Sequence, residues 1–263
     1  MNRGMRFAGV VLVLLLAVTV SAFAQGLYWE STTSGGPLGD KTMLVKTYYM
    51  PKRFKVEGAG MGQEDMIFLL DKQIIYTIQP KDKTYSEMTF AEFEAAMKKL
   101  SSKSNAKMAE LQEKMKNMPE AQRKMMEDMI NKMPGQGKEP KIDVKGTGDK
   151  KTITGYSCDK FAVTQDDKDF LSLWVTKDIS TDAMTADMKE FSQRMLSMNP
   201  AGMKGLADAM AKIKGFPMET DMAQGITQVV TKVEKRSTPD NVFQVPAGYT
   251  KVPSKLTGAD TKD

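Results

Sequence analysis

Apolar and polar residues alternate with a period of two along the first third of the chain, from Leu27 to Met88. The pattern is clearest over residues 43–49 and 74–78. This period is typical of β-strands with one buried face. Short clusters rich in glycine, proline and charged residues separate the segments, as at 34–37 and 80–83. Connections this short favour antiparallel hairpins, because parallel strands need crossovers of about a dozen residues or more.

A helical pattern begins at Thr89, a favoured N-cap residue, and Glu92 completes a capping box three positions later. Apolar residues then recur every three or four positions as far as Met133, which is typical of one apolar stripe on a helix. Pro119 interrupts the stripe, and since proline lacks a backbone N–H we expect a kink or a new helix start there. The sequence therefore predicts a methionine-rich helical insert at about residues 90–134.

Strand patterns return at residues 141–144, 151–164 and 170–179. A second helical insert is predicted at about residues 183–214, and a long strand follows over residues 227–236. Strands, then helices, then strands again are typical of an α+β protein. We expect a single domain over residues 25–263.

The first 24 residues have the three parts of a cleavable secretory signal peptide. Arg3 and Arg6 supply a positive start, residues 7–20 form an uncharged apolar run, and residues 21–24 end the signal with small side chains. An uncleaved membrane anchor is the alternative, since the apolar run approaches the roughly 20 residues that span a bilayer. The signal predicts a periplasmic or secreted protein with no membrane span in its mature form.

The composition excludes several classes of function. The 263 residues include no histidine and one cysteine, Cys158. Ser-His-Asp and Cys-His catalytic sites are therefore excluded, and the commonest general base and metal ligand is missing. The net charge is +5, but lysines are interleaved with acidic residues, which argues against a nucleic-acid partner. We expect a protein that is not an enzyme, with no cofactor and no catalytic residues.

Cys158 lies in a predicted strand. A lone cysteine in a strand is usually a small, buried apolar side chain. A reactive or dimer-forming thiol is the alternative, because an odd cysteine in an exported protein can pair between chains.

Methionine is the outstanding feature of the composition. The chain has 23 methionines, of which 21 remain once Met1 and Met5 leave with the signal peptide. Their helical spacing is compatible with ordinary helix core, with an adaptable apolar surface, and with a Cu(I) site of thioether ligands. The absence of histidine and cysteine beside them weakens the copper interpretation. Candidate thioether pairs are Met115 with Met118 and Met126 with Met129.

Six segments together carry a resemblance that spans most of the chain after the signal: Lys46–Pro51, Ile75–Pro80, Thr84–Met88, Thr154–Cys158, Leu173–Asp178 and Pro239–Tyr249. They resemble an exported bacterial family, the domain of unknown function 4412. Met118–Glu127 also resembles a helical segment of such exported proteins. The family is similar in layout to periplasmic carriers of lipoproteins and lipids, such as the outer-membrane lipoprotein carrier. The resemblance implies a curved antiparallel β half-barrel with helices inserted over its concave face.

This layout implies an apolar cavity. We expect a non-enzymatic periplasmic protein that binds or carries a lipid, an acyl chain or a lipoprotein, with sheet and methionine-bearing helices as wall and lid. A methionine-rich soft-metal (copper) protein, and a structural or interaction protein that docks an envelope partner, are the alternatives. The candidate ligand-binding residues are Tyr49, Phe54, Phe68, Tyr76, Trp174, Met115 and Met129.

Overall fold

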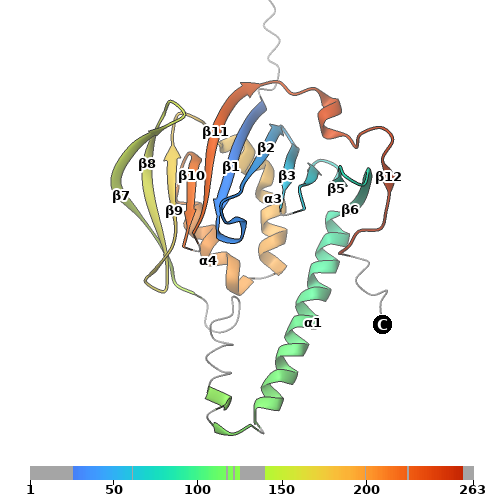
Figure 1. Ribbon diagram of the computed structural model, residues 1–263, viewed down its shortest axis with the longest axis vertical. Coiled ribbons are helices and arrows are strands. Elements are labelled where there is room, and N and C mark those ends of the chain that lie inside the picture. Colours follow the sequence, from blue (N-terminus) through green and yellow to red (C-terminus); the bar gives the residue numbers. More distant parts are fainter. Residues whose placement is uncertain are drawn as a thin grey trace, which may run out of the picture.

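The structure is a computed structural model that describes residues 26–60, 62–116, 118–120, 122–124, 140–198, 200–223 and 225–256. The predicted signal peptide lies outside these residues. The described strands form one twelve-stranded sheet (Figure 1). They are β1 (Gly26–Gly35), β2 (Thr42–Met50), β3 (Arg53–Ala59), β4 (Glu64–Leu69), β5 (Ile74–Gln79), β6 (Thr84–Thr89), β7 (Ile142–Ile153), β8 (Tyr156–Gln165), β9 (Lys168–Thr176), β10 (Phe216–Met222), β11 (Ile226–Arg236) and β12 (Thr250–Lys251).

The strand order is β12-β6-β5-β4-β3-β2-β1-β11-β10-β9-β8-β7. Strands β1 to β6 pair in sequence as antiparallel hairpins, as the short connections predict, and so do β7 to β9 and β10 with β11. Only the two-residue pairing of β12 with β6 is parallel among the described strands. The pairing of β1 with β11 joins the two halves of the chain in the middle of the sheet. The end strands β12 and β7 are not paired with each other, so the sheet is open, which fits a half-barrel. The predicted α+β class is confirmed.

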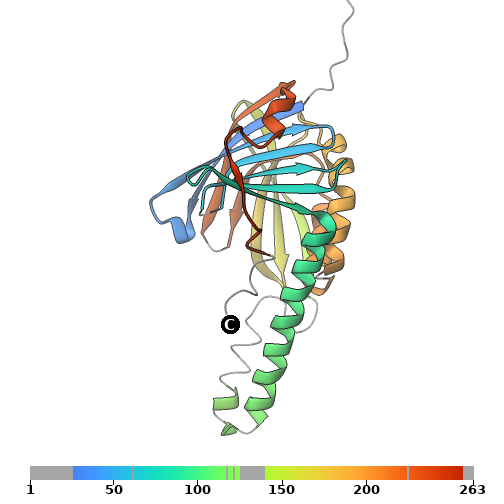
Figure 2. The ribbon, with the colours of Figure 1, turned by 90° about the vertical axis from the view of Figure 1, so that its right-hand side faces the viewer.

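Three described helices accompany the sheet: α1 (Phe90–Lys116), α3 (Asp182–Met198) and α4 (Pro200–Met210). Helices α3 and α4 lie along one side of the sheet, whereas α1 starts beside β6 and extends past the end of the sheet (Figures 1 and 2). At 1.5 Å per residue, its 27 residues span about 40 Å. None of the described helices is long and apolar enough to cross a membrane.

The capping box predicted at the start of the first helix is present. The Thr89 hydroxyl accepts a hydrogen bond from the Glu92 backbone N–H at 3.1 Å, and the Glu92 carboxylate accepts one from the Thr89 backbone N–H at 2.7 Å. Helix α1 ends at Lys116, and the Pro119 carbonyl accepts bonds from the N–H groups of Gln122 and Arg123. The helical pattern is thus interrupted before Pro119 and resumes there, as predicted.

The sheet has two chemically different faces because successive side chains in a strand point to opposite sides. The covered face, which packs against α3, carries Leu27, Tyr49 and Phe54 in the largest buried cluster, together with Met184 and Met188 of α3. The outer face carries a row of alternating charges, in which Lys232, Glu30, Lys46 and Glu57 pair across four adjacent strands.

The C-terminal strap, residues 239–251, lies against the outer face. It contains a 3₁₀ turn, η2 (Asp240–Phe243), and β12. Phe243 is buried in a cluster with Ile67, Leu69 and Ile78.

Strand β10 differs from the sequence prediction, which has no strand between the second helical insert and residue 227. The helix ends at Met210, and β10 follows over Phe216–Met222. Pro217 is the reason that the sequence pattern does not predict this strand. Proline has no N–H to donate to a neighbouring strand and is found in sheets mainly at edges and bulges. The register with β9 shifts between Pro217 and Glu219, so a bulge accommodates the proline.

Candidate ligand cavity

A cavity of about 600 Å³ lies between the covered face of the sheet and helix α3. Its volume is in the range of small-molecule sites, roughly 300–1,000 Å³. The wall comes from five strands, β1, β2, β3, β10 and β11, and the cover comes from α3. The apolar residues that line it are Trp29, Val45, Phe54, Val56, Met184, Met188, Phe216, Pro217, Met218 and Val230.

Strand register places these side chains together. Trp29 pairs with Thr47, which pairs with Val56, and paired residues of an antiparallel sheet share a face. Ser31 pairs with Val45 on one side and with Val230 on the other. The indole of Trp29 meets Phe216 edge-on, with ring centroids 5.4 Å apart. Strands from both ends of the chain therefore form one continuous apolar wall.

Hydroxyl and amide groups interrupt this wall. The Gln228 side-chain amide donates to the Ser31 hydroxyl at 3.0 Å, and Ser31 is 1% exposed. The hydroxyls of Thr47 and Thr220 also belong to the lining. Such groups fix the orientation of a ligand in an otherwise apolar site.

Glu219 contributes the one charged side chain among the described lining residues. Its carboxylate is paired with the Lys151 ammonium at 2.5 Å, and that ammonium lies 4.2 Å from the centre of the Trp174 ring. The charge of Glu219 is thus already neutralised by the protein itself.

Asp187 attaches helix α3 to the sheet beside the cavity. Its carboxylate accepts hydrogen bonds from the Tyr49 hydroxyl at 3.0 Å and the Lys52 backbone N–H at 2.7 Å, and it pairs with the Lys52 ammonium at 2.7 Å. Burial acts to raise the pKa of Asp187, but the hydrogen bonds and charge of Lys52 and the bond from Tyr49 outweigh it, and the pKa is lowered. Burial, and then the bond to Asp187, raise the pKa of Tyr49. Asp187 therefore stays ionised and Tyr49 stays protonated, so the tyrosine hydroxyl can donate to the carboxylate.

An aromatic cluster provides a second attachment for α3. The Phe191 ring lies 4.9 Å from that of Phe90 and 5.7 Å from that of Phe68, between centroids. Phe93 of α1 is 6.4 Å away. Helix α3 is therefore held at Asp187 and at Phe191, while Met184 and Met188 face the cavity between helix and sheet.

The seven candidate ligand-binding residues lie in different places. Phe54 lines the cavity, and Tyr49 and Phe68 belong to its surroundings through Asp187 and Phe191. Tyr76 lies on the outer face beside Tyr85 and the C-terminal strap. Trp174 contacts Lys151 next to Glu219, Met115 is buried in the far end of α1, and Met129 lies outside the described residues.

Several lining residues are absent from the sequence-based set. Met184 and Met188 are recognisable as one face of a predicted helix, but the sequence does not show that this helix, rather than the first insert, covers the cavity. Phe216 and Met218 lie on either side of Pro217 in β10. Their alternation with Pro217 is the sequence pattern from which this strand and its lining residues could have been predicted. Trp29 could have been found from the alternation of β1.

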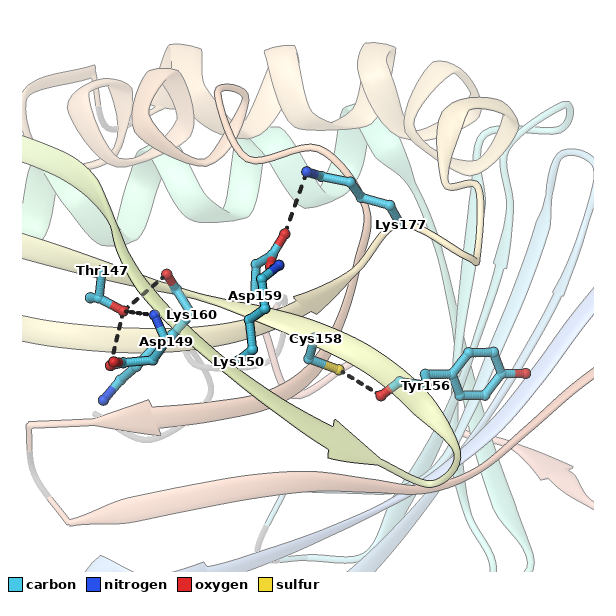
Figure 3. A network of polar contacts seen from close by, with 8 residues as sticks. All are labelled: Thr147, Asp149, Lys150, Tyr156, Cys158, Asp159, Lys160 and Lys177. Atoms are coloured by element: carbon cyan, nitrogen blue, oxygen red, sulfur yellow. Dashed lines mark hydrogen bonds and ion pairs between the residues drawn. The ribbon is translucent and has the colours of Figure 1, made fainter.

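Cys158 is buried near the start of β8, as expected for a small apolar side chain in a strand. Its thiol donates to the Tyr156 carbonyl at 3.4 Å, and beside it the Asp159 carboxylate pairs with Lys150 and Lys177 (Figure 3). Burial raises the pKa of the Cys158 thiol, which favours the unreactive form. Among the described residues, no group of three or more His, Cys, Asp or Glu side chains could hold a metal ion.

Comparison with known proteins places the chain in a family. The family model for the domain of unknown function DUF4412 matches residues 113–249, which is more than half of the chain. The chain belongs to the DUF4412 family. The match includes β10, β11 and α3 of the cavity and leaves out β1 to β3. No curated protein matches the chain.

Three solved structures are similar to this DUF4412 protein at low identity. An uncharacterised conserved protein from Thermus thermophilus is 7% identical, with 88% of this chain and 91% of that chain covered and a TM-score of 0.44. PNGF-II is 11% identical, with 90% and 32% covered and a TM-score of 0.38. A LolA superfamily protein from Nitrosomonas europaea is 6% identical, with 84% and 89% covered and a TM-score of 0.25. At these TM-scores the three likenesses do not bear on function.

Proposed function

We propose that this DUF4412 protein binds or carries a hydrophobic ligand in the cavity between its sheet and helix α3. The observation that carries the proposal is the cavity itself, about 600 Å³ with ten apolar lining residues and a helix as cover. The cavity is partly open to solvent, so an apolar ligand could enter it and cover its apolar surface. An apolar site of this size is suited to a lipid or acyl chain and needs few polar groups.

The remaining parts of the proposal concern architecture and location. The open sheet would act as a half-barrel with α3 over its concave face, so that the ligand lies between the two. The N-terminal signal sequence supports export, and the absence of histidine supports binding without catalysis. The protein would then hold its ligand in the periplasm or outside the cell.

A cavity-filling substitution tests the proposal. N-phenyl-1-naphthylamine is an uncharged apolar dye that becomes fluorescent when it leaves water. We expect the purified protein to bind it, and Val45→Trp to weaken binding by about tenfold or more because the indole occupies the cavity. Dye affinity from a fluorescence titration is the measurement.

Leu44→Trp is the matched control. Leu44 precedes Val45 in β2, points to the outer face and is 48% exposed, so the same indole would stay outside the cavity. Dye affinity should then equal that of the wild type. Equal affinity in both variants, with thermal melts that show both folded, would place the dye elsewhere and end the proposal.

A soft-metal site is the second candidate. Three thioethers, those of Met184, Met188 and Met218, line the same cavity, and thioether sulfur binds Cu(I). Native mass spectrometry after addition of Cu(I) distinguishes the two candidates. A bound copper ion that is lost in Met218→Leu would favour metal, and a spectrum without copper would leave only the apolar ligand.

A further inference from the structure

We infer that the cavity selects an uncharged amphiphile, with an apolar chain and a hydroxyl, ester or amide head, over a fatty-acid carboxylate of the same chain length. This inference rests on the proposed function and specifies the chemistry of its ligand. It depends on three features of the described lining: unpaired hydroxyl groups, the absence of a cation, and the sheet register that keeps lysines away.

The lining has unused hydrogen-bonding capacity. Thr47 is 6% exposed, and neither its hydroxyl nor that of Thr220 has a hydrogen-bond partner among the described residues. Gln228 uses one amide N–H on Ser31, which leaves its second N–H and its carbonyl available. These groups open onto the cavity, since among the described residues the one fully buried side-chain polar atom without a partner is Thr238 Oγ1. Water can pair with them in the cavity, and a ligand that displaces this water has to replace its hydrogen bonds. A neutral head that both donates and accepts hydrogen bonds would supply them.

No lysine or arginine belongs to the lining that the structure describes. The one charged lining residue is acidic, Glu219, and its partner Lys151 is engaged by that carboxylate and by the ring of Trp174. A ligand carboxylate would therefore enter a largely apolar site in which the nearby ammonium of Lys151 is already paired with Glu219. Burying an unpaired charge is strongly unfavourable, whereas burying a hydroxyl that finds a partner is not.

The described lining lacks cations because the strand register turns the nearby lysines to the other face of the sheet, and not because the strands contain few lysines. Lys46 stands between the lining residues Val45 and Thr47, and Lys55 stands between Phe54 and Val56. Both lysines point to the outer face, where Lys55 pairs with Glu57 at 2.8 Å. The protein carries a net charge of +5, so a preference for a neutral head would run against its overall charge.

Competition between two ligands with the same chain tests the inference. 1-Monolaurin and laurate, both below their micellar concentrations at pH 8, displace N-phenyl-1-naphthylamine from the wild-type protein. We expect monolaurin to displace the dye at a concentration at least about tenfold lower than the concentration of laurate needed. Laurate that displaces the dye as well as monolaurin does, or better, would overturn the inference.

Two substitutions sharpen this test. Thr220→Lys introduces a cation into the lining and should reverse the preference in favour of laurate. Gln228→Leu removes a group that both donates and accepts hydrogen bonds, and it should weaken monolaurin more than laurate, because a carboxylate can use only the donor. If the wild type binds neither dye nor either ligand, the proposed function has failed; if it binds the dye and prefers laurate, only the present inference has failed.

Discussion

Asp187 shows how a single side chain attaches the cover of the cavity to its wall. It lies on α3 and is 12% exposed, and it accepts hydrogen bonds from two groups at the end of β2 and the turn that follows. The ammonium of Lys52 is more than half exposed, so its ion pair contributes little on its own. Most of the contribution of Asp187 to the attachment of α3 therefore comes from the bonds donated by the Tyr49 hydroxyl and the Lys52 N–H.

Asp187→Asn should lower the free energy of unfolding at pH 7 by about 1–2 kcal/mol, because it removes a charged acceptor from these bonds. The pKa of Asp187 in the folded protein lies below its ordinary value of 3.8. Its contribution is thus complete above about pH 5 and is lost as the pH falls through 3.8 toward the folded-state pKa. Urea unfolding at several pH values between 7 and 3 measures the free energy of unfolding of the wild type and of Asp187→Asn.

The difference in stability between wild type and Asp187→Asn should therefore shrink as the pH falls through this window. Asp40→Asn, in an exposed turn, serves as the control and should follow the wild type at every pH. A difference between wild type and Asp187→Asn that stays constant down to pH 3 would contradict the role assigned to the Asp187 charge.

At the scale of elements, the turn before β10 decides whether that strand can approach β9. Gly215 has a φ of +123°, and a Cβ atom there would lie 2.3 Å from the Thr176 carbonyl oxygen. Both the backbone conformation and the close approach require glycine. Since Phe216 and Met218 follow directly and line the cavity, the turn also positions part of its wall.

Gly215→Ala should destabilise the protein by more than about 1 kcal/mol and weaken dye binding, because β10 must move away from β9. Gly248→Ala is the matched control, since Gly248 has a φ of +80° but no atom within 4 Å of the added methyl group. Thermal melts and dye titrations compare the two. Equal losses in both variants would show that backbone strain alone, and not the contact with Thr176, is responsible.

At the scale of the whole molecule, the two faces of the sheet carry separate cores. The covered face packs against α3 and contains the cavity, and the outer face packs against the C-terminal strap. The strap is tied down by Phe243, by an Arg53–Asp240 ion pair at 2.7 Å and by the pairing of β12 with β6. We therefore expect that stability and dye binding can be altered separately.

Phe243→Ala should lower the free energy of unfolding by about 3–5 kcal/mol, as is usual for a buried phenylalanine, and leave dye affinity unchanged at temperatures where the protein is folded. Val45→Trp should instead weaken dye binding, while its free energy of unfolding changes much less than that of Phe243→Ala. Unfolding and dye titrations on both variants provide the comparison. A loss of dye affinity in folded Phe243→Ala would show that the strap shapes the cavity from the far side.

The local pattern predicted much of the fold. The alternation before Met88, the capping box at Thr89 and the interruption at Pro119 all depend on neighbours a few positions apart, and all are present in the structure. Phe54 is the candidate residue that lines the cavity. Tyr76 has an equally strong strand pattern yet lies on the outer face, because the face of each strand depends on its pairing.

The sequence by itself determined the class of the protein, its hairpins, its helix starts and the absence of histidine chemistry, since each depends on composition or on short-range spacing. Only the tertiary structure decided that β1 pairs with β11, that a bulge accommodates Pro217 in β10, and that α3 covers the cavity. The physical reason is that these contacts join residues far apart in the sequence, from about 40 positions for Pro217 and Val175 to about 200 for Ser31 and Val230. Their free energy comes from burial and register in the assembled sheet, which no local pattern contains.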